Sequence, residues 1–257
     1  MRICIPVPCF YGKEDFCDAI GKIAAHGFDA AETYNWNSLD LIKVREACEK
    51  HGVELLSMCT TEFRMTDPQY RQAWLEGLRE SVLAANVVGA KRLITQVGQD
   101  TGAPREQQHE SIVECLKAAQ GILEDSGVTI MIEPLNTLVN HKGYYLWAAQ
   151  EAFDIIHEVD HPLVKVVYDI YHQQVMEGNI IPNVTNNLDC IAHLHSAGHP
   201  GRHELQYGEN DYNVIFAAID KAGYEGSCGL EYSPLLPADE SLDEFRRLYG
   251  ANITTKK

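Results

Sequence analysis

The chain has 257 residues, of which 45% are hydrophobic and 23% charged, a composition typical of a globular protein with a large core. Its formal net charge of −16 argues against nucleic acid as a partner, because that binding depends on Lys and Arg neutralising phosphates. No apolar run reaches the roughly 18 residues of a membrane span, and the amino terminus, MRICIPVPCFYGKEDF, becomes charged too early for a secretory signal. We therefore expect a soluble, cytoplasmic protein that binds no membrane.

The eight cysteines are scattered through apolar runs, and none forms a CxxC pair. This distribution favours reduced thiols over a disulfide framework or a zinc ribbon.

Short β-rich runs alternate with longer amphipathic segments at a spacing of about 30 residues, the size of a strand-plus-helix unit. The runs predicted as strands are, in chain order, RICIPVPCF (2–10), FDAAETYNW (28–36), VELLSMCTT (53–61), AKRLITQVG (90–98), VTIMIEPLN (128–136), VKVVYDIYH (164–172), IAHLHSAG (191–198) and GSCGLEYSP (226–234). The predicted helices occupy residues 16–24, 39–51, 67–88, 104–125, 145–159, 212–222 and 242–248. Pro182 and its neighbouring asparagines leave little room for a helix between the sixth and seventh strands.

Eight such units without a linker predict an α/β protein, a (β/α)₈ TIM barrel, as a single domain over residues 1–257. An open doubly wound sheet is disfavoured, because it requires a phosphate-binding glycine turn after its first strand and FYGKED is not one. The oligomeric state stays open, and a homo-oligomer is compatible with the sequence.

Four potential metal ligands stand near the ends of the last four predicted strands. They are Glu133 in IEPLN, Asp169 in VVYDIYH, His195 in HLHSAG and Glu231 in GLEYSP. The carboxyl ends of barrel strands surround one pocket, so these residues converge although they are far apart in sequence. A buried carboxylate is costly unless a partner or a cation compensates its charge. We therefore predict one divalent metal ion, Mn²⁺ first, with Mg²⁺, Co²⁺ or Zn²⁺ as alternatives.

Two further residues are placed by the strand pattern. His193 shares a strand face with His195 but lies one layer deeper, so we expect it to hydrogen-bond in the core or to support a ligand rather than to bind metal directly. Trp36 ends the second strand and is a candidate for the wall of the pocket.

The second half of the chain resembles a known superfamily. The stretches IEPLN, YDIYHQQVMEGN, HLHSAGHPGRHELQYGEND and GLEYSP resemble the xylose-isomerase-like TIM-barrel sugar isomerases and epimerases, and hydroxypyruvate isomerase most closely. Two departures stand out. His195 occupies the place of a glutamine in hydroxypyruvate isomerases, which is a feature of ketose 3-epimerases, and SMCTTEFRMTD replaces the NLPAGDW-like stretch expected after strand three.

The resemblance implies metal ligation by Glu133, Asp169, His195 and Glu231, with Glu133 and Glu231 also acting as the acid/base pair. It implies that His172 and Arg202 bind substrate oxygens. The expected reaction is a metal-dependent isomerisation of a small keto- or hydroxy-sugar through an enediolate, in which one glutamate removes the proton next to the carbonyl.

Other functions remain open at this stage. Ketose 3-epimerisation, and lyase, dehydratase or carbon-glycosyl cleaving chemistry on a keto-sugar, begin with the same proton abstraction. A DNA-repair endonuclease with a multinuclear zinc site needs ligands where strands three and four offer Cys59, Thr60, Gln96 and Gly98. A non-catalytic barrel is disfavoured by the intact ligand set.

Overall fold

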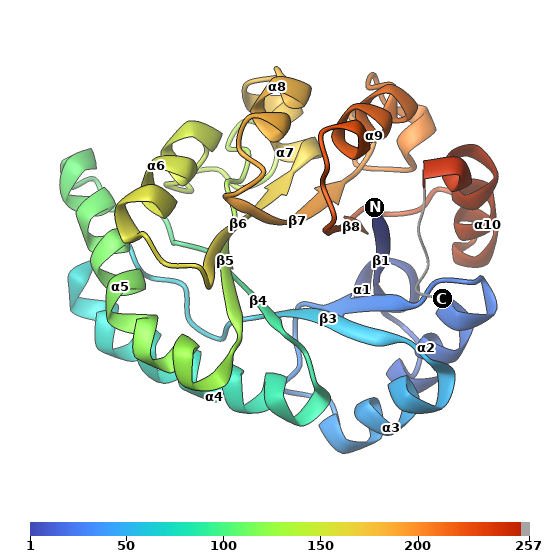
Figure 1. The fold of residues 1–257 in the computed structure, drawn as a ribbon, viewed down its shortest axis with the longest axis horizontal. Coiled ribbons are helices and arrows are strands. Elements are labelled where there is room, and N and C mark those ends of the chain that lie inside the picture. The colour runs from blue at the N-terminus through green and yellow to red at the C-terminus, as the bar shows by residue number, and fades with distance from the viewer. Residues whose placement is uncertain (253–257) are drawn as a thin grey trace.

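The computed structural model describes residues 1–252, in which parallel strands close into a barrel with helices outside it (Figure 1). The strands are β1 (Arg2–Pro6), β2 (Ala30–Thr33), β3 (Glu54–Cys59), β4 (Arg92–Thr95), β5 (Thr129–Ile132), β6 (Val164–Asp169), β7 (Ile191–Ser196) and β8 (Ser227–Leu230). Each strand pairs with the next, and β8 pairs with β1 to close the ring. The predicted (β/α)₈ TIM barrel is therefore confirmed.

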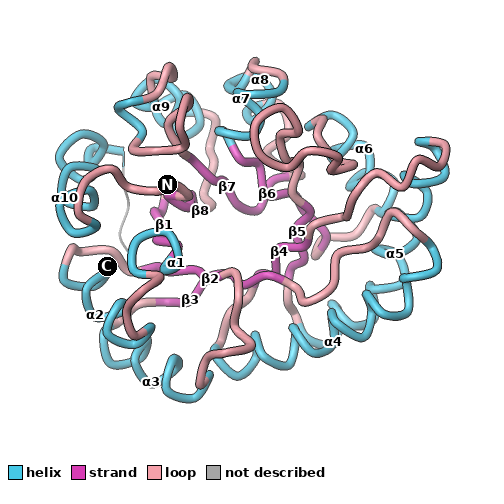
Figure 2. The backbone as a smooth tube through the Cα atoms, turned by 180° about the vertical axis from the view of Figure 1, so that it is seen from behind, coloured by secondary structure: helices cyan, strands magenta, loops and turns pink. Residues whose placement is uncertain are grey.

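The outer layer is built from helices that follow the strands in sequence (Figure 2). They are α1 (Val7–Tyr11), α2 (Phe16–Ala25), α3 (Leu41–His51), α4 (Arg71–Val88), α5 (Arg105–Ser126), α6 (Ala149–Val159), α7 (Ile170–Met176), α8 (Ile180–Thr185), α9 (Tyr212–Lys221) and α10 (Ala238–Tyr249). Single 3₁₀ turns lie at Pro68–Tyr70, Leu205–Tyr207 and Gly250–Asn252. No helix of residues 1–252 is long and apolar enough to cross a membrane.

The sixth strand ends earlier than predicted, at a residue of the candidate site. Its run was expected to extend to His172, but β6 ends at Asp169 and α7 begins at the next residue. The Asp169 side chain accepts hydrogen bonds from the backbone N–H groups of Tyr171 (2.7 Å) and His172 (3.3 Å). A carboxylate at the N-cap satisfies helix N–H groups that otherwise lack partners, which starts the helix there.

The expectation of little room for a helix before β7 is wrong. Two short helices, α7 and α8, fill that connection. Pro182 is the third residue of α8, in the first turn, where the missing N–H breaks no intrahelical hydrogen bond. The predicted helix boundaries also shift: α6 begins at Ala149, four residues later than expected, and α10 at Ala238, four residues earlier.

Several helices begin and end at the capping residues that the sequence offers. α3 and α4 stop at Gly52 (φ 67°) and Gly89 (φ 83°), in the left-handed region that glycine enters without steric cost. Among the starts, the Asp211 side chain accepts from Asn213 N and Val214 N at the beginning of α9. The glycines mark where the connections to β3 and β4 begin, and Asp211 marks where the loop after β7 ends.

The barrel interior is divided into an apolar and a polar part. Ile94, Met131 and Val167 form a small cluster apart from the main core, which lies between barrel and helices. Met131 and Val167 stand two residues before Glu133 and Asp169, so strand alternation turns all four side chains to the inside. The polar side chains thus occupy the layer nearest the carboxyl ends of the strands.

Candidate active site

The predicted quartet comes together at the carboxyl end of the barrel. Glu133 follows β5, Asp169 ends β6, His195 lies in β7 and Glu231 follows β8. His195 Nδ1 lies 3.2 Å from Glu133 Oε1 and 3.2 Å from Glu231 Oε2. Ligand atoms of Glu133, Asp169 and Glu231, together with one of His172, all lie within 4.8 Å of one another. The structure therefore brings together all four residues that the sequence selects.

The buried carboxylates of the quartet need a positive counterion. Burial raises the pKa of the Glu133 and Asp169 carboxyls above their usual range. Burial alone would lower the pKa of the His195 imidazole, but the charges of Glu231 and Glu32 outweigh it and raise that pKa well above normal. A protonated His195 thus serves as counterion to the surrounding carboxylates. A divalent cation would replace that proton, and the oxygen-rich donor set fits such an ion.

Asp169 and His172 each direct a buried polar atom into this space. Among the described residues, Asp169 Oδ2 and His172 Nε2 are buried and have no partner of hydrogen-bond geometry, although the two atoms lie 3.4 Å apart. His172 Nδ1 accepts a hydrogen bond of 3.0 Å from the backbone N–H of Asn136, so in the neutral ring the proton is on Nε2. Burial lowers the pKa of His172 well below its usual value and keeps the ring neutral. A neutral ring of this tautomer can donate to an oxygen but cannot bind a metal through Nε2.

Arg202 reaches the quartet from the loop after β7. Its Nη2 lies 2.5 Å from Glu231 Oε2 and 3.5 Å from Asp169 Oδ2, and its guanidinium lies over the Tyr171 ring at 5.0 Å. Backbone hydrogen bonds between Gly198 and His203 fold the loop so that Arg202 takes a left-handed φ of 57°. The loop therefore holds a positively charged hydrogen-bond donor beside the carboxylates. A substrate oxygen could accept a hydrogen bond from the same guanidinium.

Glu32 is a buried carboxylate that the sequence analysis overlooked. It stands in the middle of the second predicted strand run, FDAAETYNW, and lies 3.3 Å (Oε1) from His195 Nε2, on the side away from Glu133 and Glu231. Ser57 donates a hydrogen bond of 2.6 Å to Glu32 Oε2. The signal was present, because a carboxylate within an apolar strand run is the same pattern that selected Glu133 and Asp169.

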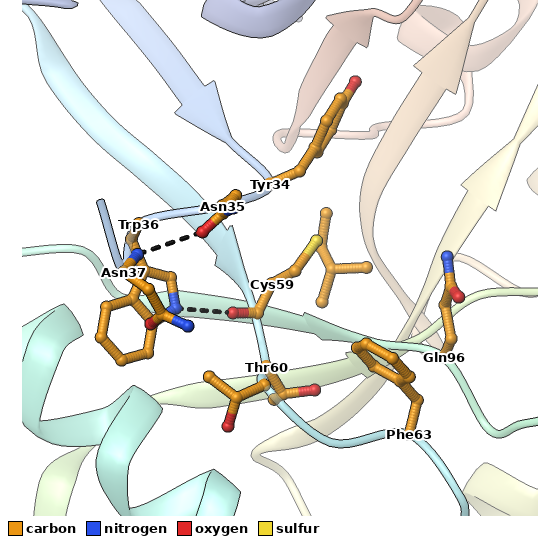
Figure 3. Close-up of a pocket in the computed structure, with 10 residues that line it drawn as sticks. Tyr34, Asn35, Trp36, Asn37, Cys59, Thr60, Phe63 and Gln96 are labelled. Atoms are coloured by element: carbon orange, nitrogen blue, oxygen red, sulfur yellow. Dashed lines mark hydrogen bonds between the residues drawn. The ribbon is translucent and has the colours of Figure 1, made fainter. Parts of the chain in front are cut away.

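A pocket of about 360 Å³ opens at the carboxyl ends of β2, β3 and β4, the same end of the barrel that carries the quartet (Figure 3). Its wall includes Trp36, as expected, whose Nε1 donates to the Cys59 carbonyl at 2.9 Å. Burial raises the pKa of the Cys59 thiol in this wall, and the charges of Glu133 and Glu231 raise it further. The ten lining residues are Tyr34, Asn35, Trp36, Asn37, Cys59, Thr60, Thr61, Phe63, Ile94 and Gln96, and none is an acid, a lysine or an arginine.

The sequence matches the xylose isomerase-like TIM barrel family over residues 20–248, and the chain belongs to that family. It is 27% identical over 251 residues to hydroxypyruvate isomerase of Escherichia coli, covering 94% of this chain and 97% of that protein. It is 28% identical over 242 residues to 2-oxo-tetronate isomerase of Cupriavidus necator, covering 91% and 93%. These relatives support an isomerase or epimerase that acts on a small substrate.

Solved structures agree on the fold. A family 2 AP endonuclease from Brucella melitensis superposes with a TM-score of 0.91 at 23% identity, covering 96% of this chain and 99% of that one. D-allulose 3-epimerase from Methylomonas sp. gives a TM-score of 0.84 at 18% identity, covering 98% of both chains. At these identities the match concerns the barrel and not the reaction, and it includes ketose 3-epimerases as neighbours.

Proposed function

We propose that this chain is a divalent-metal-dependent isomerase of a small hydroxy-carbonyl compound, which acts through an enediolate. One observation carries the proposal: Glu133 and Glu231 approach His195 Nδ1 from different strands, at 3.2 Å each, and leave a space bounded by Asp169 and His172. Two carboxylates on either side of one substrate position can remove a proton and return it.

Glu133, Asp169, His195 and Glu231 would hold the cation. When bound, the cation supplies Lewis-acid polarisation of the substrate carbonyl, which acidifies the neighbouring C–H. One glutamate takes that proton onto a carboxylate oxygen, and the C–H electron pair moves into the carbon–carbon bond of the enediolate. Returning the proton to the adjacent carbon, while the hydroxyl proton passes from one oxygen of the enediolate to the other, gives an isomer. Delivery of a proton to the original carbon from the opposite face by the second glutamate gives an epimer.

His172 and Arg202 would bind the substrate. The Nε2–H of His172 faces the carboxylate cluster, 3.4 Å from Asp169 Oδ2, since Asn136 occupies Nδ1. Arg202 donates to Glu231 through Nη2 and Nε, and the remaining N–H groups of its five can donate to a substrate oxygen while this pair stays intact. Both donate to negative charge that grows as the enediolate forms, so both favour the transition state over the ground state.

Ketose 3-epimerisation is the second candidate, and the neighbouring pocket favours it. Hydroxypyruvate has three carbons and a carboxylate, but the pocket offers about 360 Å³ beyond the quartet and its ten lining residues include no cation. Neutral amides, hydroxyls and aromatic rings suit the hydroxylated tail of a longer, uncharged ketose. His195 in β7 is the matching epimerase-like feature of the sequence.

We further propose Mn²⁺ as the native ion, since three carboxylates and one imidazole form a hard site, with Mg²⁺, Co²⁺ and Zn²⁺ as alternatives. The eight cysteines are free thiols in the structure, which suits the reducing cytoplasm.

Proton exchange tests the reaction before the product is known. The metal-free protein is loaded with Mn²⁺ and incubated in D₂O with hydroxypyruvate, ketopentoses or ketohexoses. A chelator then removes the paramagnetic Mn²⁺ from the sample. NMR finally measures deuterium at the substrate carbon next to the carbonyl. We expect deuterium incorporation with wild-type protein, and a loss of orders of magnitude in Glu133→Gln and Glu231→Gln. Exchange at the wild-type rate in either variant, or in protein stripped of metal, would contradict the proposal.

A further inference from the structure

A row of polar side chains runs through the barrel interior from its amino-terminal rim to the candidate metal site. Arg92 Nη1, at the start of β4, donates to Ser227 Oγ at 2.6 Å, and Ser227 Oγ lies 2.8 Å from His193 Nδ1. His193 Nε2 lies 3.2 Å from Glu32 Oε2, and His195 Nε2 lies 3.3 Å from Glu32 Oε1. Glu32, His193 and His195 are at most 1% exposed, so the row is shielded from bulk solvent.

The donor and acceptor roles in this row follow from its two ends. Arg92 can only donate, so Ser227 accepts from it and has its own proton left to give to His193 Nδ1. The proton of neutral His193 is then on Nε2, facing Glu32. Because Nδ1 accepts from Ser227, the hydrogen bonds alone make this ring neutral. Glu32 Oε2 accepts hydrogen bonds from Ser57 and from His195 Nε2, whereas His193 Nε2 lies 3.2 Å from it without hydrogen-bond geometry.

We propose that Glu32 is a positioning residue, which holds the Nε2–H of His195 and so presents the Nδ1 lone pair to the metal. This inference rests on the proposed function, because it assumes a cation among Glu133, His195 and Glu231. The geometry supports it directly: Nε2 faces Glu32, while Nδ1 faces Glu133 and Glu231. A carboxylate behind a metal-binding histidine fixes its tautomer and ring orientation and makes it a better ligand.

The same three residues, Glu32, His193 and His195, also lie close enough together to hold an ion of their own. The row argues against that role, because His193 Nε2 carries its proton toward Glu32 and cannot offer a lone pair there. Ser57 already donates to Glu32 Oε2. An ion bound by Glu32, His193 and His195 would have to displace the protons that face Glu32, and all three residues are buried.

Metal affinity tests the inference without measuring turnover. In Glu32→Gln the amide oxygen accepts one hydrogen bond, but its NH₂ group opposes the remaining N–H donors, and one imidazole must change tautomer. We expect the dissociation constant for Mn²⁺, measured by calorimetry, to rise about 10- to 100-fold, and the visible spectrum of the Co²⁺ form to change. Glu204→Gln is the matched control: Glu204 is 2% exposed, accepts from Leu235 N and Leu236 N, and should leave both readouts unchanged.

A second measurement uses unaltered protein, in case the variant folds poorly. In wild-type protein loaded with diamagnetic Zn²⁺, two-dimensional ¹⁵N NMR of the imidazoles reports which nitrogen of His195 carries the proton. We expect the proton on Nε2 and a metal-bound Nδ1. A proton on Nδ1 of His195 would overturn the role of Glu32, and so would a Glu32→Gln variant whose Mn²⁺ affinity and Co²⁺ spectrum are unchanged. The proposed function would stand in both cases, provided that the wild-type protein binds Mn²⁺. A wild-type protein that binds no divalent metal would overturn both.

Discussion

Asn136 holds Nδ1 of His172 with two donors, its backbone N–H at 3.0 Å and its side-chain Nδ2 at 2.7 Å. The amide cannot turn over, because its Oδ1 accepts from the backbone N–H groups of Val139 and Asn140. The direction of the His172 proton is thus set by a loop after β5, although His172 itself lies in α7.

Asn136→Asp should disturb this arrangement without removing a metal ligand. A carboxylate oxygen in place of Nδ2 demands a proton on Nδ1, in conflict with the backbone donor, and His172 loses the Nε2–H that we assign to substrate binding. We expect KM for the substrate found by deuterium exchange to rise about tenfold, equivalent to roughly 1.4 kcal/mol, while the affinity for Mn²⁺ stays within about threefold. Unchanged KM would contradict the role of His172.

Arg202→Lys tests whether the guanidinium is needed as a fork. Lysine keeps the charge but has a single compact donor group, and it cannot pair with Glu231 and donate to the substrate in the same geometry. Hydrogen bonds to charged groups contribute about 1.5–3 kcal/mol, so we expect kcat/KM to fall roughly 10- to 100-fold with metal affinity retained. Arg247→Lys, which alters an exposed pair with Glu244 on α10, is the matched control and should have no effect.

Metal binding should stabilise the fold, because the cation relieves the crowding of Asp169 with its neighbouring carboxylates. At a Mn²⁺ concentration of about 100 times the dissociation constant, the gain is roughly 2.7 kcal/mol. For a chain of this size that corresponds to a rise in Tm of about 5–10 °C. Asp169→Asn should lose most of the rise, measured by calorimetry with and without Mn²⁺. An equal rise in both proteins would place the ion elsewhere.

Gly198→Ala tests the loop that carries Arg202. A Cβ at this position would fall on the carbonyl oxygen of Glu204 and within 3.2 Å of Gly208 N, both backbone atoms that cannot swing aside. We expect turnover to drop as in Arg202→Lys, with Mn²⁺ binding preserved. Gly121→Ala in α5, where a Cβ meets nothing within 4 Å, should instead stabilise the protein by about 0.5–1 kcal/mol and leave turnover unchanged.

The sequence predicted the barrel and brought the quartet to one place because both depend on repeated, local features. Each predicted strand is a run rich in apolar residues, and each ligand stands near the carboxyl end of its run. The barrel topology alone therefore makes the four ligands converge. The family of the chain was predicted from motifs of its second half and is confirmed. His193 also lies where strand alternation puts it, with its ring centroid 4.9 Å from that of His195.

The sequence did not predict partners that meet across the barrel. Glu32 and His195 are 163 residues apart, and nothing in either local sequence says that they face each other. The end of β6 was missed for a similar reason: Asp169 belongs to an apolar run, but its side chain turns back to cap α7. Local patterns identify candidate residues, whereas the closed sheet determines which of them meet.

A crystal of the protein grown with Mn²⁺, measured at the manganese absorption edge, tests the central claim most directly. We predict one anomalous peak per chain, at about 2.0–2.3 Å from an oxygen of Glu133, Asp169 and Glu231 and from Nδ1 of His195. A peak among Glu32, His193 and His195 instead, or no peak at either place, would contradict the account.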